Sequence, residues 1–151
     1  MAKKVYVLNG PNLNLLGTRE PEKYGASNLK DVETLCRAAA ARHQFEVEFR
    51  QSNHEGVIVD WIHEAARESA VGVVINPAGY TTTSIAILDA ILAVKLPVIE
   101  VHITNIHARE SFRHDSFVSR AAKAVICGFG VQGYALAIDG LAGLAGATAK
   151  R

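Results

Sequence analysis

The sixteen residues 98–113, VIEVHITNIHARESFR, begin as a short apolar run and end in a series of polar side chains. The apolar part predicts a buried strand from Val98 to His102. Because side chains alternate between the two faces of a strand, Glu100 and His102 point to the same side. A carboxylate beside an imidazole fixes the tautomer and the orientation of the ring. We therefore expect the chemistry of this protein at the end of this strand.

Four other segments predict strands, and helical patterns separate them. The strand segments are Lys4–Asn9, 45–50, Val71–Ile75 and Ala124–Cys127. Apolar residues recur at the spacing of an amphipathic helix within residues 29–43, 58–66, 85–94 and 131–147. Asn28 offers an N-cap to the first of these helices, and the run 81–84, TTTS, offers a cap to the third. Polar and apolar residues alternate in 45–50, which indicates a strand near the sheet edge.

Strands that alternate with helices predict an α/β fold with a parallel sheet. At this chain length the commonest topology is flavodoxin-like, with strand order 2-1-3-4-5 and helices on both faces. Ligands bind beyond the carboxyl ends of the strands in such sheets. Polar residues follow four of the predicted strands: Asn9 and Asn12, residues 52–55, Asn76, and residues 100–105. We expect them to meet on one rim.

Length and composition predict one domain, residues 1–151, since 49% of the residues are hydrophobic and 21% are charged. The formal net charge is only +1, with both signs spread along the chain, so we expect no nucleic-acid or anionic-membrane partner. The sequence carries no signal-peptide pattern and no apolar run of membrane length. Cys36 and Cys127 have no metal spacing and suit reduced core residues. We expect a cytoplasmic protein.

Residues 12–27, NLNLLGTREPEKYGAS, show neither a strand period nor a helix period. A loop of this length inside a compact domain is usually a lid, a binding loop or disordered. We expect a lid at about residues 18–27, carrying Arg19 and Tyr24. The last helix contains four glycines, each costing up to about 1 kcal/mol relative to alanine, so it needs packing to hold it. Residues 147–151 are expected to fray.

The rim lacks several common kinds of site. GPNLNLLG is neither a dinucleotide-binding nor a P-loop motif, and no metal-binding spacing or nucleophile elbow occurs. We therefore expect no metal and no cofactor, and a nucleotide- or flavin-binding module is disfavoured. The remaining equipment suits acid–base chemistry: His102 backed by Glu100, a tyrosine on a loop, several arginines, and asparagines that can bind hydroxyl groups.

Five motifs in order carry a resemblance to a known family: 9–25 NGPNLNLLGTREPEKYG, 50–56 RQSNHEG, 60–65 DWIHEA, 75–81 INPAGYT and 99–113 IEVHITNIHARESFR. The chain resembles the type II 3-dehydroquinate dehydratases from about residue 5 to the final helix. The resemblance implies a lyase of shikimate or quinate metabolism that reversibly removes water from 3-dehydroquinate. The implied product is 3-dehydroshikimate, formed by anti elimination through an enolate without metal, Schiff base or nucleotide.

The resemblance also implies roles for individual residues. Tyr24 matches the base that removes the C2 proton, and Arg19 and Arg109 match the arginines that keep it ionised. His102 matches the acid that protonates the departing hydroxyl, and Glu100 the residue that holds its ring. Asn12 matches the residue that steadies the enolate through a bound water. Ile103 and Thr104 match the contacts with the substrate carboxylate, and Asn76 and Arg113 match contacts with the ring hydroxyls or the acid C1 substituents. Asp89 matches a residue that reaches the site from a neighbouring subunit.

One position departs from the family pattern. Where the family usually has histidine between two threonines, this chain has Thr82, whose reach to a substrate hydroxyl is shorter. We expect weaker substrate binding with the chemistry retained. A catalytically weak paralogue that binds or senses a polyhydroxylated carboxylate is the alternative. The resemblance further implies a homododecamer built of trimers.

A tyrosine ordinarily ionises near pH 10, so a phenolate at neutral pH requires about 4 kcal/mol of stabilisation. One exposed arginine supplies only about 0.2 to 1 kcal/mol. We therefore expect Arg19 to be insufficient alone. Arg109, together with a closed lid that lowers the local dielectric constant, would supply the rest.

Overall fold

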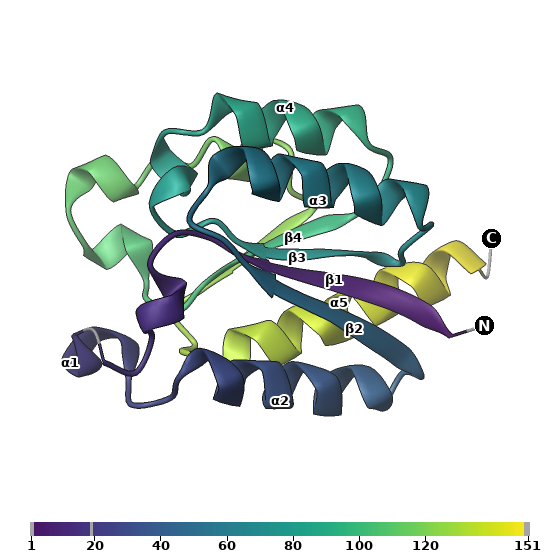
Figure 1. Ribbon diagram of the computed structural model, residues 1–151, viewed down its shortest axis with the longest axis horizontal. Coiled ribbons are helices and arrows are strands. Elements are labelled where there is room, and N and C mark those ends of the chain that lie inside the picture. Colours follow the sequence, from purple (N-terminus) through teal and green to yellow (C-terminus); the bar gives the residue numbers. More distant parts are fainter. Residues whose placement is uncertain (1, 19, 150–151) are drawn as a thin grey trace.

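The computed structural model describes residues 2–18 and 20–149, which form a five-stranded parallel sheet with helices on both faces (Figure 1). The strand order is β2-β1-β3-β4-β5. This confirms the predicted flavodoxin-like topology. Arg19 of the expected lid, and Lys150 and Arg151 of the expected frayed tail, lie outside the described residues.

The strands are β1 (Lys3–Asn9), β2 (Phe45–Gln51), β3 (Gly72–Asn76), β4 (Val98–His102) and β5 (Ala124–Cys127). The helices are α1 (Pro21–Tyr24), α2 (Leu29–Ala41), α3 (Glu55–Arg67), α4 (Ile85–Ala93) and α5 (Gln132–Ala149). Short 3-10 helices lie in the connections: η1 (Leu13–Leu15), η2 (Ala78–Thr82), η3 (Ile106–Ala108), η4 (Ser111–Arg113) and η5 (Val118–Arg120).

Each face of the sheet carries its own core. Helices α2 and α5 cover one face and α3 and α4 the other (Figure 1). Alternation along β1 divides its side chains accordingly: Val5 and Val7 lie in the first core, and Tyr6 and Leu8 in the second. The central strands β3 and β4 are buried over their whole length. These two strands deliver Asn76 and His102 to the same end of the sheet.

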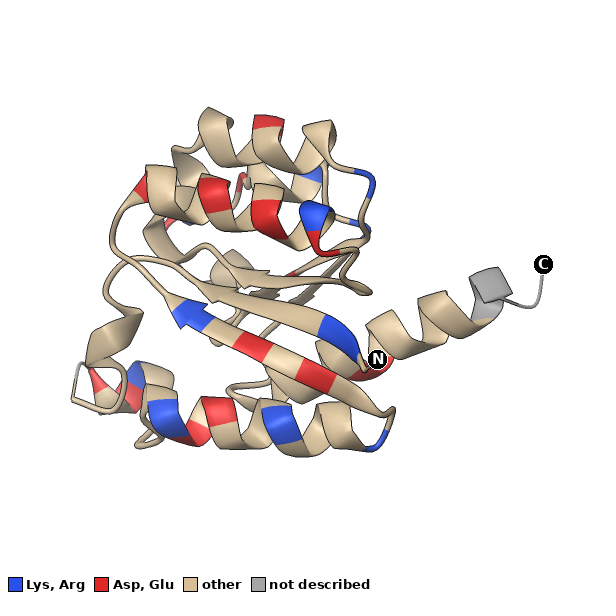
Figure 2. Ribbon diagram, turned by 45° about the vertical axis from the view of Figure 1, so that its right-hand side comes forward, with Lys and Arg blue, Asp and Glu red and all other residues tan. Residues whose placement is uncertain are grey.

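Strand β2 lies at one edge of the sheet, as its alternating sequence predicted. Glu46 is exposed on this strand while Val47 is buried. Figure 2 shows charged residues along β2, α2 and α3. The residues with which these two helices enter the cores are apolar: Val32 and Cys36 of α2, and Ile58 and Ile62 of α3.

Packing holds the glycine-containing helix α5, as the sequence suggested. Tyr134, Ile138 and Leu141 are all 0% exposed in the first core. A Cβ atom on Gly133 would lie 3.3 Å from Val101 Cγ1, so glycine lets the helix approach β4 closely here. Among the described residues, no helix is long and apolar enough to cross a membrane.

One local prediction was wrong. The long loop is not without regular structure, because it contains η1 and the four-residue helix α1; Pro21 begins α1, where its fixed φ and missing N–H cost nothing. The predicted cap of α4 within the run 81–84 is confirmed. Ser84 provides it by accepting a 2.9 Å hydrogen bond from Ile87 N, while Thr81 and Thr82 belong to η2. Segments this short carry no periodic signal.

Candidate active site

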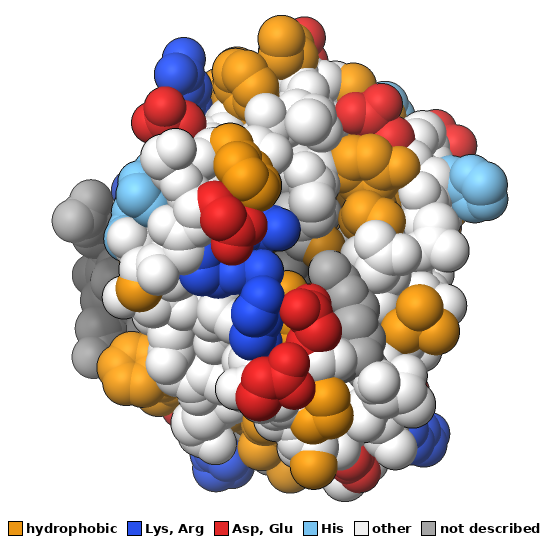
Figure 3. All heavy atoms as spheres, turned by 90° about the vertical axis from the view of Figure 1, so that its left-hand side faces the viewer, with side chains coloured by type: hydrophobic (Ala, Val, Ile, Leu, Met, Phe, Trp, Pro, Cys, Tyr) orange, Lys and Arg blue, Asp and Glu red, His pale blue; other side chains and the backbone are white. Residues whose placement is uncertain are grey.

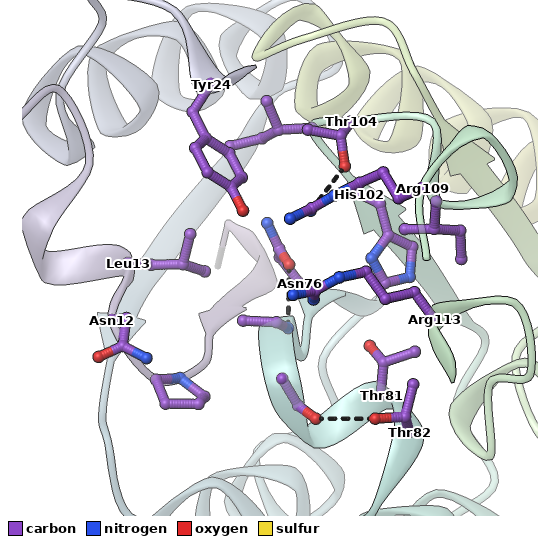
Figure 4. Close-up of a pocket in the computed structure, with 15 residues that line it drawn as sticks. Asn12, Leu13, Tyr24, Asn76, Thr81, Thr82, His102, Thr104, Arg109 and Arg113 are labelled. Carbon is purple, nitrogen blue, oxygen red and sulfur yellow. Dashed lines mark hydrogen bonds between the residues drawn. The ribbon is translucent and has the colours of Figure 1, made fainter. Parts of the chain in front are cut away.

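A cavity of about 250 Å³ opens at the carboxyl ends of the strands, beside α1. On this face of the molecule, basic side chains gather near the centre with acidic ones beside them (Figure 3). Tyr24 and His102 reach the cavity from opposite sides (Figure 4). The other lining residues come from the connections after β1, β3 and β4: Pro11, Asn12, Leu13, Asn76, Ala78, Gly79, Thr81, Thr82, Ile103, Thr104, Ile106, Arg109 and Arg113.

His102 and Glu100 form a buried pair at the end of β4. His102 is 5% exposed and Glu100 is 0% exposed. Nε2 of His102 is hydrogen-bonded to Oε2 of Glu100. The pairing expected from strand alternation is therefore present, and Nδ1 is the nitrogen of His102 that remains for a ligand in the cavity.

Two serines near η5 complete the surroundings of Glu100. Ser119 Oγ donates to Oε1 at 2.6 Å, and Ser116 Oγ donates to Oε2 at 2.9 Å. Burial alone would raise the pKa of Glu100, but the hydrogen bonds from His102 and Ser119, followed by that from Ser116, outweigh it and hold the pKa below its usual value. Glu100 is therefore a carboxylate that can hold a protonated imidazole.

Tyr24 lies at the end of α1, with the guanidinium of Arg109 over its ring at 5.5 Å from the centroid. This distance is within the range of a cation–π interaction. Arg109 is itself held by a 3.2 Å hydrogen bond from Nη1 to Oγ1 of Thr104, and its side chain is 14% exposed. Its buried Nε has no hydrogen-bond partner among the described residues and lies 3.9 Å from Glu110 Oε1, an ion-pair distance. Arg109 thus brings a largely desolvated positive charge, paired with Glu110, to the tyrosine.

The floor of the cavity rests on a buried polar network. Asn76 Nδ2 donates to Tyr134 Oη at 2.8 Å, and Tyr134 Oη donates to Asn9 Oδ1 at 2.8 Å. Burial raises the pKa of Tyr134, so this phenol stays protonated. The network connects α5 to the ends of β1 and β3. It leaves the second N–H of the Asn76 amide, which lies at the cavity wall, as a donor for a ligand.

The connection after β1 crosses closely over the end of β3. Gly10 N donates to Asn76 O at 2.8 Å, and a Cβ atom on Gly10 would lie only 2.4 Å from Pro77 O. A larger residue there would push the chain away from β3. Two residues later, Asn12 adopts a left-handed conformation with φ of 70°, and its N–H donates to Asn53 Oδ1 at 3.0 Å. This places Asn12 at the cavity edge.

Most of the predicted site residues meet in this cavity. Asn12, Tyr24, Asn76, Thr82, His102, Ile103, Thr104, Arg109 and Arg113 line it, and Glu100 lies directly behind His102. Arg113 is held by a 2.8 Å hydrogen bond from its Nε to Glu110 Oε2. Asp89 is exposed on α4 and is not among the lining residues. Arg19 lies outside the described residues.

Sequence reasoning missed Thr81, Ser116, Ser119 and Tyr134. Thr81 ends the motif 75–81, but the hydroxyl run around it was interpreted only as a helix cap. No motif marks the other three, since serine is common in turns and Tyr134 lies on an apolar helix face. Among the described residues, no group of three His, Cys, Asp or Glu side chains is placed to hold a metal ion.

Comparisons with known proteins indicate the family of this chain. Residues 3–142 match the family model described as dehydroquinase class II. A 3-dehydroquinate dehydratase from Acidovorax ebreus is 66% identical over 94% of this chain and 99% of its own length. One from Rhodopseudomonas palustris is 60% identical over 99% of both chains.

A solved structure gives the same result at the level of the fold. The crystal structure of a type II dehydroquinase from Propionibacterium acnes superposes with a TM-score of 0.90 at 45% sequence identity. The match covers 95% of this chain and 98% of that one.

Proposed function

The chain belongs to the class II dehydroquinases, enzymes with 3-dehydroquinate dehydratase activity, and we propose that it works by anti elimination through an enolate with Tyr24 as base and His102 as acid. The product is 3-dehydroshikimate, an intermediate of shikimate or quinate metabolism. The observation that carries this proposal is the approach of Tyr24 and His102 to one cavity from opposite sides (Figure 4). Anti elimination requires a base and an acid on opposite sides of the substrate.

The first step breaks the C2–H bond. The phenolate of Tyr24 takes the proton, and the electron pair moves toward the neighbouring carbonyl to form an enolate. Asn12, at the cavity edge, steadies this enolate through a bound water. The guanidinium of Arg109, at 5.5 Å from the centre of the tyrosine ring, favours the charged phenolate before the step.

The second step breaks the C1–O bond. The enolate returns its electrons to form the conjugated C1–C2 double bond, and His102 gives a proton to the departing hydroxyl, which leaves as water. Glu100 holds the imidazolium beforehand, because its carboxylate is buried, hydrogen-bonded and charged. Tyr24 has gained one proton and His102 has lost one, and exchange with solvent restores both.

The remaining lining residues orient the substrate. The backbone of Ile103 and the hydroxyl of Thr104 hold its carboxylate. The Thr104 hydroxyl already accepts from Arg109, so its own proton remains available to a ligand oxygen. Asn76, Arg113 and Thr82 contact the hydroxyl groups of the ring. Thr82 is the weakest of these contacts, since its hydroxyl lies 3.4 Å from Gly79 O and points back to the backbone.

The phenolate needs more than one arginine. Its stabilisation at neutral pH requires about 4 kcal/mol, and an exposed ion pair supplies at most about 1 kcal/mol. The low exposure of Arg109 strengthens its field, because a charge shielded from water is screened less. Residues 18–27 act as a lid whose closure, with Arg19, supplies the remainder.

The enzyme assembles as a homododecamer built of trimers, in which Asp89 reaches the site of a neighbouring subunit. Asp89 is exposed on α4 between Ile85 and Leu92, two large apolar side chains that are 56% and 64% exposed. These three side chains share one helix face by their spacing. Light scattering of the purified protein measures the assembly mass, and a monomer at micromolar concentration contradicts this part of the proposal.

One assay tests the mechanism. Formation of the conjugated enone from 3-dehydroquinate is followed by absorbance in the wild type and in Tyr24→Phe, which lacks only the phenolic oxygen. We expect signal from the wild type and a loss of about 10³-fold in the variant, within the range for general-base catalysis. Normal turnover by Tyr24→Phe contradicts the assignment of the base.

A further inference from the structure

The hydroxyl of Thr81 is a buried polar group without a partner in the wall of the cavity. Thr81 is 3% exposed, and among the described residues its Oγ1 finds no hydrogen-bond partner. It lines the same cavity as His102 and Arg113 (Figure 4). An unsatisfied buried hydroxyl costs about 1–3 kcal/mol, and native proteins keep few of them. This one therefore needs an explanation.

The backbone fixes Thr81 in this position. Residues 78–82 form η2, and the carbonyl oxygen of Thr81 accepts a 2.9 Å hydrogen bond from Phe117 N. This bond ties η2 to the segment that carries Ser116 and Ser119. The threonine therefore stays against the cavity, where water is the only alternative partner in the absence of a ligand.

Neighbouring hydroxyls already have partners. Thr82 Oγ1 faces Gly79 O at 3.4 Å, and Ser84 Oγ caps α4. Thr81 differs from both, because its hydroxyl makes no hydrogen bond to any residue that the structure describes. Within the protein, the side chain of Thr81 can therefore contribute to stability only through the packing of its methyl group.

We propose that the Thr81 hydroxyl binds a ring hydroxyl of the substrate, a contact that rests on the function proposed above. The guanidinium groups of Arg109 and Arg113 can only donate hydrogen bonds. A ligand hydroxyl that accepts from an arginine must place its own proton on an acceptor. Oγ1 of Thr81 supplies that acceptor. This contact would add to the weak contact that Thr82 makes with the ring hydroxyls of the substrate.

The test removes the hydroxyl while keeping the shape of the side chain. Thr81→Val is compared with Thr81→Ser, which keeps the hydroxyl, and with Thr83→Val, which changes an exposed threonine outside the cavity. The measurements are KM, kcat, the Kd of 3-dehydroshikimate and the thermal unfolding midpoint. We expect Thr81→Val to raise KM and Kd about tenfold with kcat within about twofold, as for one lost hydrogen bond.

Stability separates a binding role from a structural one. The midpoint of Thr81→Val should equal or exceed that of the wild type, because the missing hydroxyl had no partner among the residues that the structure describes. Thr81→Ser should bind within about twofold of the wild type, and Thr83→Val should match it throughout. Wild-type Kd in Thr81→Val overturns the inference, and so does a fall in its midpoint that accompanies the weaker binding.

Product analogues that each lack one ring hydroxyl provide a second measurement, should Thr81→Val fold poorly. One of them should bind the wild type about tenfold more weakly than the product, and this difference should vanish in Thr81→Ala. If Thr81→Ala still binds every one of these analogues more weakly than the product, to the same degree as the wild type does, the inference is overturned. Failure of the proposed function would look different, because the wild type itself would form no enone from 3-dehydroquinate.

Discussion

The two sides of the cavity are built in different ways. On the acid side, His102 and Glu100 end a strand whose five residues are all buried, and Glu100 receives hydrogen bonds from His102 and two serines. On the base side, Tyr24 ends a four-residue helix that buries none of its side chains. Tyr24 itself is half-buried, and Arg109 reaches it from another segment.

Under the proposed mechanism, this difference divides the work of catalysis between the fold and the segment that carries α1. The proposed acid, His102, is held by the core of the protein before any substrate arrives. The proposed base, Tyr24, depends on a segment with little packing of its own. Changes on the side of His102 should therefore affect the loss of water, whereas changes on the side of Tyr24 should affect proton removal.

The largest effect should separate proton removal from loss of water. Tyr24→Phe should abolish exchange of the substrate C2 proton in D₂O, whereas His102→Asn should keep that exchange and lose dehydration by about 10²- to 10⁴-fold. Proton NMR measures the exchange and absorbance the dehydration. The assignment of acid and base is wrong if His102→Asn stops both reactions.

A second variant removes the charge behind the acid. Glu100→Gln leaves the imidazolium without its counter-charge, and breaking a buried charged pair costs about 3 kcal/mol or more, so kcat should fall about 10²-fold. A kcat equal to that of the wild type would mean that Glu100 does not support the acid.

The carboxylate of Glu100 should also affect how stable the protein is at low pH. Its folded pKa lies below the usual value of 4.5, so its contribution to stability is complete above pH 4.5 and disappears as the pH falls through the folded value. The thermal unfolding midpoint of the wild type should therefore decrease as the pH is lowered below 4.5. Glu100→Gln should lose less stability over that range.

On the side of the proposed base, Arg109→Gln should lower kcat/KM about tenfold, equal to about 1.4 kcal/mol. Tyr24 loses a largely desolvated neighbouring cation in this variant. Arg120→Gln is the matched control, because Arg120 is exposed and does not line the cavity. If kcat/KM of Arg109→Gln equals that of the wild type, Arg109 does not support the base.

A smaller effect tests the serines. Ser119→Ala removes the 2.6 Å donor to Glu100 and should lower kcat several-fold, since such a bond contributes about 1.5–3 kcal/mol to the charged form. The pKa of Glu100 should rise, so acid destabilisation should begin at higher pH. Ser111→Ala, at an exposed serine on η4, should change neither quantity. If kcat falls but the pH at which acid destabilises the protein does not change, Ser119 does not act through the charge of Glu100.

The smallest effect concerns the departure at position 82. Thr82→His should lower KM several-fold with kcat within about twofold, because the longer side chain reaches a substrate hydroxyl without a bridging water, which costs about 0–2 kcal/mol. Thr83→His places the same ring at an exposed neighbour as the control. A KM that does not fall counts against this account of Thr82.

The sequence predicted the elements whose signal extends over many residues. Strand alternation placed Glu100 beside His102, and the order of elements predicted the topology. It did not predict α1, whose four residues make little more than one turn and show no repeating pattern. It also missed Ser119 and Thr81, since a hydroxyl gains its role from residues distant in the chain. Tyr134 lies 58 positions from its partner Asn76, a distance that no local pattern reports.

The hydrogen bonds that join Tyr134 to Asn76 and Asn9 have a consequence for how the enzyme matures. Asn76 leaves the ribosome 58 positions before the tyrosine to which it is bonded, and Asn9 earlier still. The sheet can begin to form during synthesis, as amino-terminal elements generally do. The pocket nevertheless acquires its floor only when α5 docks, so a nascent chain should show no activity before α5 has been synthesised.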